Sequence, residues 1–121
     1  MKKIIFADDD PTIQDVVNLI FEGEYDVTVF SSGEPLLKNE FVLPDLFLLD
    51  KQLSGMDGLD ICRFLKSQES TKDVPVIIIS ANPKIFELAK SAGADAAIEK
   101  PFPIKELRDL IEFHLRRAAR N

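Results

Sequence analysis

Three continuous apolar runs stand out along the chain, at residues 4–7, 46–49 and 74–79. Runs of this length without polar alternation are typical of strands buried on both faces of a parallel sheet. Two weaker strand patterns complete the series. Tyr25, Val27 and Val29 alternate with polar residues, and a short apolar run covers residues 96–98. The pattern therefore predicts five strands.

Between these strands, apolar residues recur every three or four positions, which is the spacing of one face of a helix. The first helix is predicted to begin after Asp10, because aspartate is a favoured N-cap and Pro11 suits the first helical position. A short, weaker helix is predicted at residues 34–41. The apolar stripes of the other four helices are Ile13, Val16, Val17 and Ile20; Leu59, Cys62 and Leu65; Ile85, Leu88, Ala89 and Ala92; and Ile104, Leu107, Leu110, Ile111 and Leu115.

Strands that alternate with helices over short connections predict a parallel sheet with right-handed crossovers. The expected fold is a doubly wound, flavodoxin-like α/β domain of three layers, with a five-stranded parallel sheet between helices. No linker or repeat interrupts the series, so residues 1–121 are expected to form one domain without an output domain. In such sheets ligands bind beyond the carboxyl ends of the strands.

Charge and composition narrow the class of partner. The chain has 121 residues, with 15 Lys and Arg against 21 Asp and Glu, for a formal net charge of −6. Nucleic acids and anionic membranes are bound by basic faces, so we expect neither as a direct partner. Arg116, Arg117 and Arg120 complement the C-terminal dipole of the last helix instead of forming a basic patch.

The compartment follows from what the sequence lacks. Cys62 is the only cysteine, which excludes an intramolecular disulfide, and with the single His114 it excludes the usual structural zinc site. No apolar run is long enough to span a bilayer, and the first residues do not have the pattern of a secretory signal. A cytoplasmic domain is the expectation.

Polar residues end four of the predicted strands. Asp8 and Asp9 end the first strand, Asp50 the third, Ser80 the fourth and Lys100 the fifth. These side chains should converge on one crevice at the carboxyl edge of the sheet. Carboxylates this close would raise one another's pKa, and a hard divalent cation with oxygen ligands, Mg²⁺ or Mn²⁺, relieves the repulsion.

A hydroxyl and an ammonium beside such a metal site suit a phosphoryl group, whose oxygens need neutralising during transfer. Ser80 and Lys100 supply these two groups. A carboxylate such as Asp50 can itself be the nucleophile and form an acyl phosphate.

The motifs at residues 4–10, 48–58, 77–81 and 99–102 together resemble those of response-regulator receiver domains of two-component signalling, including the chemotaxis regulators. The resemblance covers essentially the whole chain. It implies that Asp50 is the phosphoacceptor, and that Asp8, Asp9, Asp50 and the backbone carbonyl of Gln52 bind the metal. It also implies a cis peptide bond between Lys100 and Pro101.

In the same family, a residue like Ser80 hydrogen-bonds the phosphoryl group and one like Lys100 pairs with it. The phosphodonor would be a phosphohistidine on a sensor histidine kinase or a histidine phosphotransfer protein. The domain would catalyse only its own phosphorylation and dephosphorylation, and would act on a downstream protein or output domain. The face of the last helix is where we expect such a target, or a second copy in a homodimer.

Several positions depart from the family pattern. Ser54 stands where proline is common, and Ser80 where threonine is commoner. Ala97 replaces an aromatic residue whose ring turns inward on activation, so output would travel through the loop after Ser80 or the last helix. Gln52 and Asn82 occupy positions that tune dephosphorylation in the family.

Two other functions compete with a signalling switch. A small Mg²⁺-dependent phosphatase resembling haloacid dehalogenases would use Asp8 as nucleophile, but this alternative leaves Asp50 without a role. A degenerate receiver that only docks a partner would not need the acids, the hydroxyl and the lysine together. Asp57 and Gly58 are interpreted as turn and helix-start residues, and Cys62 and His114 as packing residues.

Overall fold

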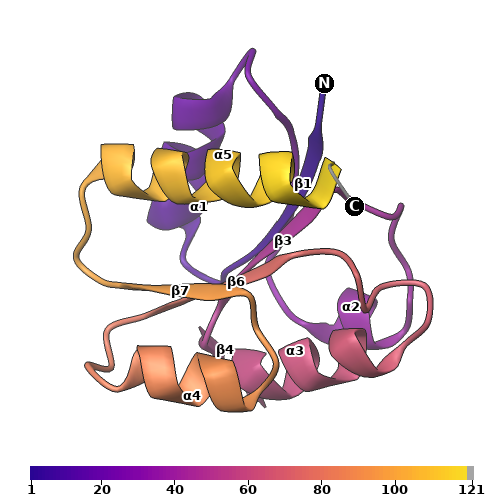
Figure 1. Ribbon diagram of the computed structural model, residues 1–121. Helices are drawn as coiled ribbons and strands as arrows, with labels where there is room; N and C mark the ends of the chain where they lie inside the picture. Colours follow the sequence, from indigo (N-terminus) through magenta and orange to yellow (C-terminus); the bar gives the residue numbers. More distant parts are fainter. Residues whose placement is uncertain (120–121) are drawn as a thin grey trace.

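The computed structural model of the protein describes residues 1–119, so Arg120 lies outside the described residues. The main sheet has five parallel strands in the order β2-β1-β3-β6-β7 (Figure 1). Its strands are β1 (Lys3–Ala7), β2 (Asp26–Phe30), β3 (Leu46–Asp50), β6 (Val76–Ser80) and β7 (Ala96–Glu99). This order confirms the predicted doubly wound topology and makes four of the strands that end in polar residues direct neighbours.

Helices cover both faces of the sheet, with α1 and α5 on one side and α2, α3 and α4 on the other (Figure 1). The helices are α1 (Pro11–Phe21), α2 (Glu34–Leu37), α3 (Gly58–Ser67), α4 (Ile85–Ser91) and α5 (Ile104–Ala119). Asp10 caps α1 as predicted, since its carboxylate accepts the backbone N–H of Thr12 at 2.9 Å.

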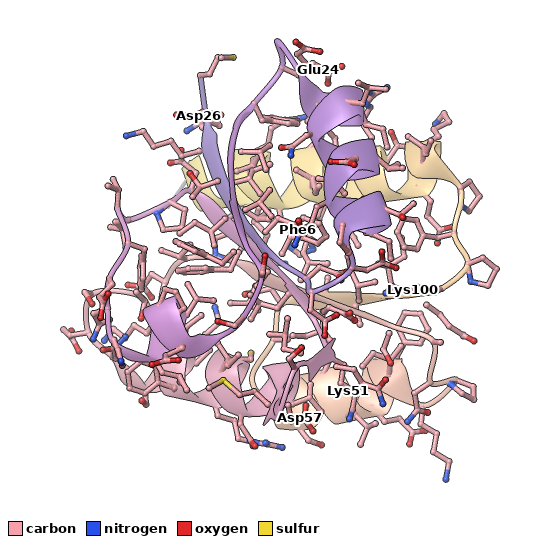
Figure 2. All side chains as sticks on the ribbon, turned by 180° about the vertical axis from the view of Figure 1, so that it is seen from behind. Phe6, Glu24, Asp26, Lys51, Asp57 and Lys100 are labelled. Carbon is pink, nitrogen blue, oxygen red and sulfur yellow. The ribbon has the colours of Figure 1, made fainter. Side chains whose placement is uncertain are left out.

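Two hydrophobic cores, one on each face, explain the continuous apolar runs. Ile5 and Phe47 point to the α2–α3–α4 side, whereas Phe6 and Leu48 point to the α1–α5 side, where Figure 2 shows Phe6 in the interior. All four side chains are essentially inaccessible to solvent. Burying a side chain of this size stabilises a fold by about 1.5–3 kcal/mol, so the central strands hold the sheet edge in place.

Three details of the helices differ from the predictions. Val16, predicted to face the sheet, is 46 % exposed. The buried residues of α1 are instead Val17 and, four positions later, Phe21. Ile104, the first residue of α5, is 48 % exposed, and the buried face of this helix begins one turn later at Leu107. The second helix ends at Leu37 instead of residue 41, since Asn39 adopts the left-handed conformation with φ 56°.

A two-stranded hairpin that the sequence pattern did not predict follows β3. It consists of β4 (Gln52–Leu53) and β5 (Met56–Asp57), which pair antiparallel. Gly55 lies in the turn with φ +71°, a conformation that glycine adopts without steric cost. The hairpin extends from the carboxyl edge of the sheet, beside the polar strand ends.

Candidate functional site

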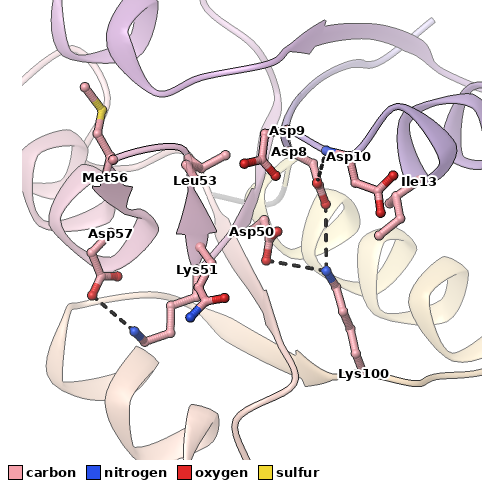
Figure 3. Close-up of a pocket in the computed structure, with 12 residues that line it drawn as sticks. Asp8, Asp9, Asp10, Ile13, Asp50, Lys51, Leu53, Met56, Asp57 and Lys100 are labelled. Carbon is pink, nitrogen blue, oxygen red and sulfur yellow. Dashed lines mark hydrogen bonds and ion pairs between the residues drawn. The ribbon is translucent and has the colours of Figure 1, made fainter.

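Four of the five polar residues at the strand ends, Asp8, Asp9, Asp50 and Lys100, converge. One carboxylate oxygen each of Asp8, Asp9 and Asp50 lies within 4.8 Å of the other two. The Lys100 ammonium lies 3.5 Å from Oδ1 of Asp50 and 3.8 Å from Oδ2 of Asp8 (Figure 3). The Lys100–Pro101 peptide bond is cis, as the sequence resemblance implied. These side chains line one cleft that opens at the carboxyl edge of the sheet.

Asp8 is completely buried, and its two carboxylate oxygens have different surroundings. Oδ1 accepts the backbone N–H of Asp10 at 2.9 Å, whereas Oδ2 has no hydrogen-bond partner within residues 1–119. Burial raises the pKa of this carboxyl to about 6; the Asp10 N–H opposes the rise, and the charge of Asp50 adds to it. A buried carboxylate oxygen without a hydrogen-bond partner can serve as a ligand for a cation.

Asp50 is also buried, with 7 % of its surface exposed. Burial raises the pKa of its carboxyl, while the Lys100 ammonium and the backbone N–H of Gln52 favour the charged form. Its position at the end of β3 directs the carboxylate into the cleft beside Lys100 (Figure 3). The carboxyl group is therefore held at one place beside the positive charge of Lys100.

The donor set of the cleft suits a hard divalent cation. Two buried carboxylates and the exposed Asp9 supply oxygen ligands, and Gln52 also lines the cleft. Mg²⁺ and Mn²⁺ prefer such ligands and keep waters that a phosphoryl oxygen can replace. With Oδ2 of Asp8 unbonded, the residues fit a bound cation of this kind.

Ser80 reaches the same edge but is engaged differently. It is the last residue of β6, which lies beside β3, and its backbone carbonyl accepts the N–H of Lys100 at 2.8 Å. Its hydroxyl oxygen accepts the backbone N–H of Asn82 at 3.0 Å, and the Asn82 side chain accepts that of Lys84 at 2.9 Å. Ser80 is thus linked to the start of α4 and is not among the residues that line the cleft.

Ala97 lies away from the acids, in the middle of β7. It borders a shallow apolar depression between α4 and α5, where Phe86 and Phe113 are each 56 % exposed. The predicted site residue Ala97 is therefore not part of the cleft.

The structure also shows residues near the site that the sequence left as structural. Lys51, next to Asp50, pairs with Asp57 at 3.1 Å, and both line the cleft. Gly58 packs so tightly that a β-carbon there would lie 2.2 Å from the carbonyl oxygen of Asp50. The hydroxyl of Ser54 donates to Oδ2 of Asp9 at 2.7 Å. Their place in the motif at residues 48–58 is the only sequence signal that could have drawn attention to them.

A parallel sheet with acids, a hydroxyl and a lysine at its carboxyl edge suits a protein that transfers or receives a phosphoryl group. The chain belongs to the response regulator receiver domain family, whose model matches residues 4–112. It is thus a receiver domain of two-component signalling, a switch that depends on phosphorylation.

Two curated relatives match nearly the whole chain. The DNA-binding response regulator MtrA of Mycolicibacterium smegmatis is 35 % identical over 120 residues, which cover 96 % of this chain and 51 % of that protein. The DNA-binding dual master transcriptional regulator RpaA of Synechocystis is 34 % identical, over 99 % of this chain and 52 % of that protein. The chain spans about half the length of these relatives.

A solved structure supports the fold. The receiver domain of a sensor histidine kinase from Pseudomonas aeruginosa has a TM-score of 0.83 and 27 % sequence identity, covering 94 % of this chain and 97 % of that one. That structure has a magnesium ion coordinated in its active-site cleft.

Two expectations from the sequence need correction. The haloacid dehalogenase alternative is not supported, because the family that matches is the receiver family. The expectation of no nucleic-acid partner is wrong, since both relatives are DNA-binding regulators. The net charge is that of this chain alone. The chain spans about half the length of those regulators, so its charge gives no information about their other half.

Within residues 1–119, no helix is both long and apolar enough to cross a membrane.

Proposed function

We propose that Asp50 accepts a phosphoryl group while Asp8, Asp9, Asp50 and the carbonyl of Gln52 hold Mg²⁺ or Mn²⁺. The observation that carries the proposal is the position of Lys100, whose ammonium lies within 4 Å of both buried carboxylates in one cleft. A lysine placed there can pair with an oxygen of a phosphoryl group on Asp50. The magnesium-bound receiver of the sensor kinase supports the choice of cation.

The transfer is a displacement at phosphorus. A carboxylate oxygen of Asp50 forms a bond to the phosphorus of a phosphohistidine on a sensor kinase or phosphotransfer protein. The phosphorus–nitrogen bond breaks, and its electron pair stays on the imidazole nitrogen, which takes up a proton. A bound divalent cation neutralises the acids and the transferring oxygens. Burial raises the pKa of the Asp50 carboxyl, while Lys100 and the Gln52 N–H favour its charged form, the form that attacks phosphorus.

Ser80 connects this chemistry to the surface. Its hydroxyl oxygen accepts the Asn82 N–H, so its own proton remains available for a phosphoryl oxygen on Asp50. A movement of Ser80 toward that oxygen would pull on Asn82 and Lys84, which precede α4. Because Ala97 has no aromatic ring to report the change, we assign the signal to this loop, while Gln52 and Asn82 set the lifetime of the adduct.

The two relatives extend the proposal to output. MtrA is a DNA-binding response regulator and RpaA a DNA-binding transcriptional regulator, and this chain matches about half the length of each. We therefore propose that phosphorylation of Asp50 controls DNA binding in a regulator of this kind.

The test is phosphorylation in vitro. The protein is incubated with acetyl phosphate, and separately with a phosphohistidine donor, with Mg²⁺ or with a chelator. We expect an acid-stable, hydroxylamine-labile adduct that requires Mg²⁺ and is absent in Asp50→Asn. Failure of every donor would overturn the proposal. So would continuous turnover of p-nitrophenyl phosphate that persists in Asp50→Asn and is lost in Asp8→Asn.

A further inference from the structure

Ser54 contacts Asp9, the exposed member of the cluster of Asp8, Asp9 and Asp50. Its hydroxyl donates to Oδ2 of Asp9 at 2.7 Å, across 45 positions of sequence. Within residues 1–119, this is the only hydrogen bond that the Asp9 carboxylate receives. The contact joins the loop after β1 to the β4–β5 turn, two segments that both line the cleft.

We propose that Ser54 is a positioning residue that orients the Asp9 carboxylate for the divalent cation. The inference rests on the proposed function, because it assumes that Asp9 is a metal ligand. It adds a residue that makes no contact with the cation itself and acts through Asp9.

Exposure is the reason that Asp9 needs such a partner. Asp8 and Asp50 are buried, and packing restricts their side chains, whereas Asp9 is exposed. A free aspartate side chain samples several rotamers, and a cation must select one of them at an entropic cost. A charge-assisted hydrogen bond that already favours one orientation reduces this cost before the cation arrives.

A role in the turn is the other explanation for Ser54, and the backbone makes the two separable. Ser54 and Gly55 are the central residues of the hairpin turn, and only Gly55 has positive φ, at +71°. That is the pattern of a type II turn, in which proline is favoured at the first central position. Proline would therefore serve the turn at least as well as Ser54, but it has no hydroxyl to donate to Asp9.

The experiment measures Mg²⁺ dissociation constants by calorimetry, and unfolding free energies in chelator, for the unmodified protein and for Ser54→Ala, Ser54→Pro and Ser54→Thr. We expect Ser54→Ala and Ser54→Pro to bind Mg²⁺ about three- to tenfold more weakly. Ser54→Thr, which keeps a hydroxyl, should retain the affinity. Ser54→Pro should lose no metal-free stability, since it suits the turn.

A double-mutant cycle with Asp9→Ala completes the test. In that background, Ser54→Ala should have no further effect on Mg²⁺ affinity, because its partner is gone. Normal affinity in Ser54→Pro or in Ser54→Ala, or an undiminished effect of Ser54→Ala without Asp9, would overturn the positioning role alone. Absence of Mg²⁺ binding in the unmodified protein would instead overturn the proposed function.

Discussion

The buried oxygen Oδ2 of Asp8 lies 3.8 Å from the Lys100 ammonium, yet it receives no hydrogen bond within residues 1–119. Lys100 is closer to Asp50, at 3.5 Å, so one positive charge is shared between two buried carboxylates. Such an arrangement is unfavourable for the folded state without a second cation. Keeping the proposed metal ligand Asp8 and the proposed nucleophile Asp50 side by side therefore costs the folded state some stability.

Asp8→Asn should stabilise the metal-free protein at pH 7.5. Burial raises the pKa of Asp8 from 3.8 to about 6, so the folded state binds more protons than the unfolded state between these values. The stability contributed by this group is present at low pH and is lost as pH rises through about 6. Each pKa unit corresponds to about 1.4 kcal/mol, so removing the charge should raise the free energy of unfolding by roughly 2–3 kcal/mol at pH 7.5. Below pH 4 the substitution should have little effect, because Asp8 is then protonated in the folded state.

Denaturant unfolding of both proteins across pH, with a chelator, measures this difference. Adding Mg²⁺ should then stabilise the unmodified protein but not Asp8→Asn. A variant that is less stable than the unmodified protein at pH 7.5 in chelator would contradict the interpretation of Asp8 as an uncompensated buried charge.

Lys100→Gln should separate metal binding from phosphorylation. The ammonium and a divalent cation compete for the same carboxylates, so its removal should leave Mg²⁺ affinity equal or up to about tenfold tighter. The phosphoryl group would lose its paired lysine, and the rate of adduct formation should fall by about tenfold or more. Calorimetry and phosphorylation time courses measure the two effects, and a loss of Mg²⁺ affinity in this variant would count against the assignment.

Gly58→Ala should displace the proposed phosphoacceptor Asp50 through its backbone. The added β-carbon would lie 2.2 Å from the carbonyl oxygen of Asp50, so the strand end or α3 must move, at a cost of about 1–3 kcal/mol. Gly23→Ala is the matched control, because φ of +80° there costs about 1 kcal/mol in open space far from the cleft. Both variants should be destabilised, but only Gly58→Ala should also slow phosphorylation. Equal phosphorylation rates in the two variants would contradict this.

His114 should give a separate, smaller dependence of stability on pH. Burial lowers its pKa below 6.5, and Arg117 and Lys66 act in the same direction while Asp95 opposes them. The unfolded state therefore binds more protons just below pH 6.5, and stability falls as pH decreases through that range. His114→Leu should remove this slope. As the only histidine, it gives a single imidazole signal for NMR titration, and a value at or above 6.5 would refute the prediction.

The strands were predictable because their physical signal is local. Residues 46–49 are apolar at every position, which requires cover on both faces, and the structure buries them completely. Helix faces were less certain. Periodicity alone favoured Val16, but the larger Phe21 on an adjacent row packs against the sheet and leaves Val16 exposed. The β4–β5 hairpin has strands of only two residues, too short for any alternation to be recognised.

The acids of the site were predictable from strand order, but their support was not. Asp8, Asp50 and Lys100 converge because parallel strands end at one edge of the sheet. The hydrogen bond from Ser54 to Asp9 joins residues 45 positions apart and depends on the turn around Gly55. No local sequence pattern encodes a contact of that range. The approach of Gly58 to Asp50 likewise depends on how the hairpin returns to the sheet.

The location of the phosphoryl group tests the central claim most directly. The protein is phosphorylated with acetyl phosphate and Mg²⁺, digested at low pH, and the modified residue is mapped by tandem mass spectrometry. The account predicts one phosphoryl group, on Asp50, with none detected in Asp50→Asn. A phosphoryl group on Asp8 or Asp9, or an adduct that remains in Asp50→Asn, would contradict it.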